Sequence, residues 1–99
     1  MATLKANGPA LLILERVIEG KDMKPEENTS GIIWEKTTLA VHANGKVLEK
    51  WDYHVPDGLS GAIRKEHVAW KVRSKIDKTK LNDLAKIEQY FAKQGFKKV

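Results

Sequence analysis

The 99-residue chain carries 18 basic and 13 acidic side chains, a formal net charge of +5, and 41% of its residues are apolar. Area scaling then predicts a single domain, residues 1–99, in which folding buries about 65% of the extended-chain surface. Because the sequence has no cysteine, it excludes a disulfide framework and a thiolate metal site, and the default compartment is the cytoplasm. The longest apolar run, residues 10–14, is too short for a signal peptide or a membrane span.

The excess positive charge falls in one stretch of the chain. Residues 1–50 hold seven basic and seven acidic side chains, whereas residues 61–80 alone have a net charge of +5. Such clustering is typical of a basic patch that meets nucleic acid or an acidic protein. A solvated surface without a partner is the structural alternative.

The first third of the chain predicts a flexible segment, a strand and a loop. Residues 1–8 are polar and lead into the turn sequence Asn7-Gly8-Pro9, so we expect them to be flexible. Residues 10–19 fit a helix between Pro9 and Gly20, but their alternation favours a strand. A third strand is also expected because a hairpin alone is unstable in water. Residues 20–31, with Pro25, two glycines and five charged side chains, predict a mobile loop.

Residues 32–55 predict a β-hairpin, around which the rest of the chain is organised. Two runs rich in Val, Thr, Trp and Tyr flank Ala43-Asn44-Gly45. A two-residue Asn-Gly loop would leave both faces mixed. A three-residue loop, with Gly45 left-handed in a bulge, places His42 opposite Lys46 and gathers one apolar face, so we favour it. That face consists of Ile33, Leu39, Val41, Val47, Trp51, Tyr53 and Val55.

A further strand is expected after the hairpin. Pro56-Asp57-Gly58 predicts a turn, and Ser60 can cap a short helical turn that ends near Arg64. Residues 67–75 then alternate between an apolar and a basic face, whereas a helix over residues 60–76 would scatter its apolar side chains. The apolar face would hold Val68, Trp70 and Val72, and the basic face Lys71, Arg73 and Lys75. We also expect Trp51 and Trp70 in the core.

Residues 78–94 predict a C-terminal helix. Asp77 is a suitable N-cap, and apolar residues recur at three- and four-residue spacing from Leu81 to Phe91. Gly95 fits a left-handed residue at the end of the helix, with Phe96 returning onto Phe91 in a Schellman motif. The fold class is therefore α+β: a single antiparallel sheet of three to four strands built on the hairpin, with the helix on one face.

The sequence offers no catalytic residues, no metal site and no cofactor motif. In the preferred register, His42 and His54 lie at opposite ends of the hairpin, roughly 25 Å apart at strand rise, and no second ligand spacing completes a metal shell around His67. The serines lie outside any nucleophile motif, and no phosphate-binding glycine pattern occurs. We expect exposed histidines and a protein that is not an enzyme.

Trp34 is the most informative single residue. The preferred register places it on the polar face beside His54, where an indole flanked by lysines can stack on a nucleobase. The first hypothesis is a domain that binds single-stranded nucleic acid; the alternative is an interaction module or inhibitor for an acidic protein, dimeric through a sheet edge. Lysine-rich edge strands that only suppress aggregation are a third account. The candidate binding residues are Trp34, Lys36, Lys46, Lys50, Lys71, Arg73 and Lys75.

Overall fold

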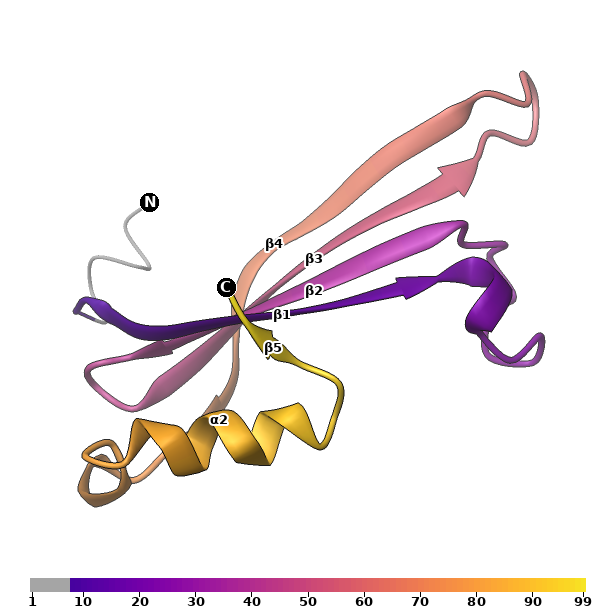
Figure 1. Cartoon of the computed structure of the whole chain (residues 1–99). Coiled ribbons are helices and arrows are strands. Elements are labelled where there is room, and N and C mark those ends of the chain that lie inside the picture. The colour runs from indigo at the N-terminus through magenta and orange to yellow at the C-terminus, as the bar shows by residue number, and fades with distance from the viewer. Residues whose placement is uncertain (1–7) are drawn as a thin grey trace.

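A computed structural model describes residues 8–99, in which a twisted antiparallel sheet carries one helix at one end (Figure 1). Residues 1–7, which belong to the N-terminal segment expected to be flexible, lie outside the described residues. The elements in chain order are β1 Ala10–Glu19, the 3₁₀ turn η1 Gly20–Asp22, β2 Trp34–His42, β3 Lys46–Pro56, β4 Ile63–Lys75, the 3₁₀ turn η2 Lys78–Lys80, α2 Leu84–Ala92 and β5 Lys97–Lys98.

The sheet has five strands in the order β4-β3-β2-β1-β5, so the chain is α+β with one antiparallel sheet. The first four strands form a meander, and residues 10–19 are the strand that their alternation predicted. The fifth strand was not predicted. After α2 the chain returns to the free edge of β1, where Lys98 lies opposite Leu14 and Lys97 opposite Glu15.

The register of the central hairpin follows the three-residue loop. Val41 lies opposite Val47 and Leu39 opposite Glu49. The Gly45 N–H donates to the His42 carbonyl at 2.9 Å, and Gly45 has φ +89°, which is the left-handed residue of a bulged turn. A Cβ at Gly45 would also collide with the Ile76 carbonyl oxygen, so glycine is required here for two reasons.

Strand β4 departs from the expected alternation because it contains two β-bulges. It begins at Ile63, and the expected helical turn capped by Ser60 is instead a tight reversal in which the Asp57 N–H donates to the Ala62 carbonyl at 2.7 Å. One bulge lies between the pairs Val47–Ser74 and Leu48–Val72, and the other between the pairs Glu49–Lys71 and Trp51–Val68.

The bulges place Val68 and Val72, two of the apolar residues of β4, on opposite faces of the sheet. Val72 lies opposite Leu48, whereas Val68 lies opposite Trp51 and therefore on the other side of the sheet. The expectation that Val68, Trp70 and Val72 share a face was wrong.

The C-terminal helix is shorter than predicted. Asp77 caps the 3₁₀ turn η2, and Asp83 accepts from the Lys86 N–H at the start of α2. The end of α2 agrees with the prediction: the Phe96 N–H donates to the Phe91 carbonyl at 3.1 Å around left-handed Gly95, which completes a Schellman motif.

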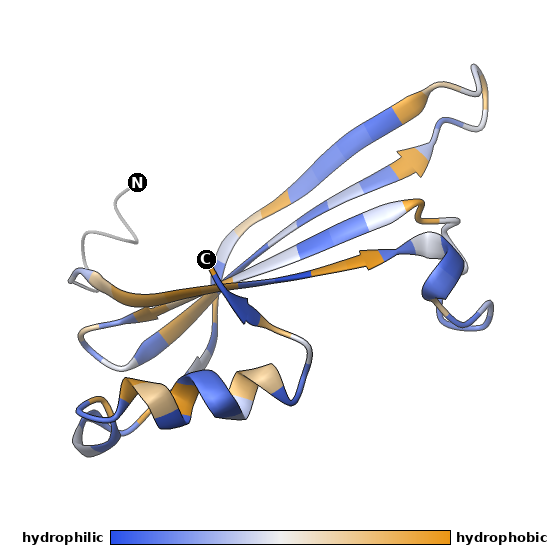
Figure 2. Ribbon diagram, in the orientation of Figure 1, coloured by the Kyte–Doolittle hydropathy of each residue, from blue (hydrophilic) through white to orange (hydrophobic). Residues whose placement is uncertain are grey.

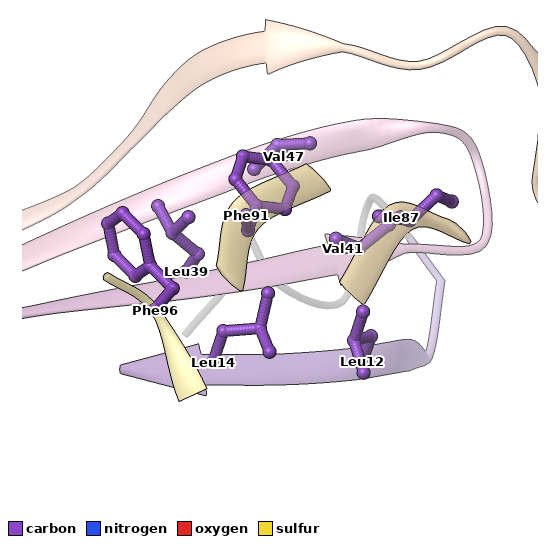
Figure 3. Packing of buried hydrophobic residues seen from close by; sticks show 8 residues of the cluster. All are labelled: Leu12, Leu14, Leu39, Val41, Val47, Ile87, Phe91 and Phe96. Carbon is purple, nitrogen blue, oxygen red and sulfur yellow. The ribbon is translucent and has the colours of Figure 1, made fainter. Parts of the chain in front are cut away.

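The core lies at the end of the sheet near residues 43–45, between the sheet and α2. Figure 3 shows the side chains of α2 meeting those of β1, β2 and β3, and Figure 2 shows apolar residues concentrated at this end while the far parts of the strands are largely polar. Trp51 and Trp70 are only half-buried, so their expected place in the core was wrong. The buried cluster consists of Leu12, Leu14, Leu39, Val41, Val47, Ile87, Phe91 and Phe96.

The chain is elongated because the short helix covers only part of one face. Its Cα radius of gyration is 15.6 Å, whereas a compact chain of this length is expected at about 13 Å. Beyond α2, the strands continue with neither face covered by a helix (Figure 1). We call the side of the sheet that bears α2 the helix face and the opposite side the open face.

Candidate functional site

The far half of the open face carries the aromatic and basic side chains singled out in the sequence. Strand pairing places Trp34 opposite His54, Lys36 opposite Asp52 and Thr38 opposite Lys50. These residues alternate with the helix-face residues of the same strands, so they project together on the open side.

Trp34 forms the aromatic part of this surface. Its ring centroid lies 4.6 Å from that of His54, with the planes tilted by 33°, and both side chains are half-buried. His54 therefore supports the indole from one side. An indole braced in this way and half-exposed is the arrangement with which proteins stack unpaired bases.

Lysines surround the Trp34–His54 pair. Lys36 and Lys50 are half-buried on the two central strands, and Lys65 on β4 lies directly opposite His54. Two carboxylates lie beside these lysines. Asp52 contacts the Lys50 ammonium at 3.9 Å, which is a weak contact. Glu19 lies opposite Trp34 on β1 and pairs with Lys21 at 3.1 Å, so basic side chains still outnumber acidic ones here.

A second basic position lies at the other end of the open face. Lys46 and Lys75 are directly opposite each other on β3 and β4. Like charges in directly opposed positions destabilise a sheet, and a bound anion between them would relieve that repulsion. Eight residues of β3 separate Lys46 from His54, so the two basic positions are roughly 26 Å apart at strand rise.

Two of the seven candidate residues lie elsewhere. Lys71 lies opposite Glu49 on the helix face. Arg73 is also there, where Nη1 donates to Glu49 at 3.1 Å, Nη2 to Gln94 at 3.4 Å, and the guanidinium lies 5.5 Å from the Phe96 ring centroid. Arg73 therefore has a structural role at the edge of the core. The prediction that Lys71, Arg73 and Lys75 share one basic face was wrong, because a bulge separates Arg73 from Lys75.

Sequence reasoning missed Lys65. The strand was expected to begin at His67, which left Lys65 outside the sheet. Residues 63–66, Ile-Arg-Lys-Glu, do not alternate between apolar and polar side chains, so the sequence holds no pattern that would have extended the strand to Lys65.

The histidines differ in exposure. His42 was expected to be exposed, but it is only 2% exposed, and its Nδ1–H donates a hydrogen bond to the Gly8 carbonyl oxygen at 2.9 Å. The chain before β1 therefore covers the hairpin tip. Within residues 8–99, no three His, Asp or Glu side chains gather as potential metal ligands.

A groove of about 820 Å³ lies away from this surface, between the end of β4 and α2. Its walls carry Asp77 and Asp83 as well as lysines, and Arg73 at its rim is already paired. Since no single charge dominates it, the groove does not define a ligand class.

Comparisons with known proteins identify no relative. The chain matches no protein-family profile, and neither a curated protein nor a solved structure is significantly similar to it. Across residues 8–99, no helix is long and apolar enough to cross a membrane.

Proposed function

We propose that this chain is a non-enzymatic domain that binds single-stranded nucleic acid on the open face of its sheet. The observation that carries the proposal is the half-exposed Trp34, braced by His54 and surrounded by Lys36, Lys50 and Lys65. Stacking on Trp34 supplies contact with any base, and the lysines neutralise phosphates, which favours binding with little sequence preference. Lys46 and Lys75 extend the path along the face.

The expected affinity is micromolar, with a strong dependence on salt. The lysines of the proposed path are Lys36, Lys46, Lys50, Lys65 and Lys75. If each of these five neutralises one phosphate, the slope of log K against log salt is about −3.5 for a single strand, so affinity falls about a hundredfold between about 50 and 200 mM salt. Fluorescence anisotropy with a labelled oligonucleotide of about 12 nucleotides measures both quantities.

Matched variants separate stacking from charge. Trp34→Ala is expected to weaken binding by about 1 to 3 kcal/mol with the slope unchanged, whereas Trp51→Ala, on the opposite face of the same hairpin, leaves binding unchanged. Replacing Lys36, Lys50 and Lys65 together by glutamine should reduce the slope to about −1.4.

The control triple variant replaces Lys71, Lys86 and Lys93, which lie on the helix face and on α2 and its C-cap. It should leave the slope near −3.5. The proposal fails if the wild-type chain does not bind at about 50 mM salt, or if both triple variants flatten the slope equally. Recovery of a stoichiometric acidic protein instead of nucleic acid would favour the alternative of an interaction module.

A further inference from the structure

We propose that two histidines on the open face make its binding of nucleic acid dependent on pH, so that a single strand is held more tightly in mildly acidic solution. The two histidines are His54, which braces Trp34, and His67 on β4. This regulation presupposes the proposed function, because the same surface binds the strand. Each imidazole that takes up a proton adds one positive charge to those of the lysines.

Strand pairing places both imidazoles among the lysines. His54 lies directly opposite Lys65, and His67, two residues further along β4, lies directly opposite Asp52. The two histidines are therefore diagonal neighbours on the open face, a spacing of about 7 to 8 Å between Cα atoms. Both lie next to Lys65, one of the lysines expected to neutralise a phosphate.

The two histidines of the open face are accessible to a ligand, whereas the third is not. His67 is exposed and His54 is half-buried. His42 is only 2% exposed at the hairpin tip, where it donates to the Gly8 carbonyl oxygen. Histidine is the side chain whose charge ordinarily changes between about pH 5 and 8. The chain has three histidines and no cysteine, so two of the three groups of this kind lie on the proposed binding surface.

The charges around His54 couple proton uptake to binding. Lys65 lies directly opposite His54 on β4, and Lys36 lies diagonally across from it on β2. A proton on His54 therefore adds to positive charge that is already there, and a bound phosphate relieves the repulsion. Proton uptake and strand binding favour each other, as linkage requires. The charged and titratable groups that face the two histidines, besides each other, are Lys36 on β2, Lys50 and Asp52 on β3, and Lys65 on β4, with Glu19 on β1 beyond Trp34.

A proton on His54 also stabilises the aromatic part of the site. The ring centroids of Trp34 and His54 are 4.6 Å apart. A cation within about 6 Å of an indole centroid is attracted to the face of the ring, so the charged imidazole holds Trp34 more firmly in place for stacking. His67 is two strands away from Trp34 and contributes charge alone.

Anisotropy titrations with an oligothymidine of about 12 nucleotides, at about pH 8 and about pH 5.5, test the proposal across the range in which histidine gains its charge. The oligonucleotide has no terminal phosphate, so that nothing in the ligand titrates in this range. We expect the slope of log K against log salt to steepen from about −3.5 to about −4.9, which is about 0.7 for each histidine. At about 0.1 M salt, affinity should rise about 25-fold if the added contacts contribute nothing at about 1 M.

Glutamine variants assign the effect to the two histidines. His54→Gln and His67→Gln should each leave a rise of about fivefold, and the double variant should bind equally at both pH values with a slope near −3.5. The double variant keeps His42 and every other titrating group of the chain, so it is the matched control. The measured quantity is the ratio of affinities at the two pH values, which loss of the contact with Trp34 alone would not change.

His67→Lys supplies a permanent charge at the exposed position. It should bind at about pH 8 with a slope of about −4.2 and should show only the pH effect of His54. Circular dichroism at both pH values verifies that each variant is folded.

Three results would overturn the proposal. If the wild-type chain binds at about pH 8 with the same affinity and slope as at about pH 5.5, the regulation is absent and the proposed function stands. If the double variant keeps the full pH effect, the group that titrates lies elsewhere. If the chain binds at neither pH at about 50 mM salt, the proposed function is refuted and this regulation with it.

Discussion

Gly45→Ala tests a close approach of two backbones in the fold. Gly45 has φ +89°, its carbonyl accepts from the Ile76 N–H at 2.7 Å, and a Cβ would collide with the Ile76 carbonyl oxygen. A left-handed alanine costs roughly 1 to 2 kcal/mol, offset by about 0.4 to 1 kcal/mol from the less flexible unfolded chain. Moving the two backbones apart adds about 1 kcal/mol for the hydrogen bond and 1 to 3 kcal/mol for the displaced packing.

The expected loss of unfolding free energy is therefore about 4 kcal/mol, or roughly 20 °C in melting temperature for a domain of this size. Denaturant titration followed by tryptophan fluorescence measures it. Gly61→Ala is the matched control, because Gly61 has φ +74° but nothing lies within 4 Å of the added Cβ. It isolates the conformational part and should lose about 0.5 to 1 kcal/mol. If the two variants lose equal stability, the hairpin tip does not press against Ile76 and the reasoning is refuted.

Three further outcomes are expected. Gly95→Val should lose about 1 to 2 kcal/mol by denaturant titration, since φ is +94°; wild-type stability would refute the Schellman ending. Trp51→Ala should lose about 2 kcal/mol and Trp34→Ala about 1 kcal/mol, because Trp51 also donates to a carboxylate at 2.8 Å; the reverse order would contradict the assigned faces. Hydrogen bonds from the Thr79 N–H and hydroxyl hold the pKa of Asp77 below its ordinary value of 3.8, so the stability it contributes is present above about pH 4 and lost on further acidification. The difference in melting temperature between wild type and Asp77→Asn should therefore shrink from about pH 5 to pH 3, and a constant difference would exclude this linkage.

The hairpin was predictable because its register follows from burial. Moving the pairing by one residue would turn Val47 to the face opposite that of Leu39 and Val41, so only one loop length gives a single apolar face. That register also placed Trp34 beside His54, which is the centre of the candidate site. Burial of one face could not predict the bulges of β4, because they depend on how β4 pairs with β3. No glycine in β4 marks their position either.

The remaining differences arise from contacts between distant segments. β5 has two lysines and no strand pattern of its own; it forms because the Schellman turn directs the chain back to β1. His42 is buried by the approach of Gly8, more than thirty positions earlier in the chain. A bulge moves one residue to the opposite face, so the sequence assigned Lys71 and Arg73 to the wrong side of the sheet while it placed Lys36 and Lys50 correctly.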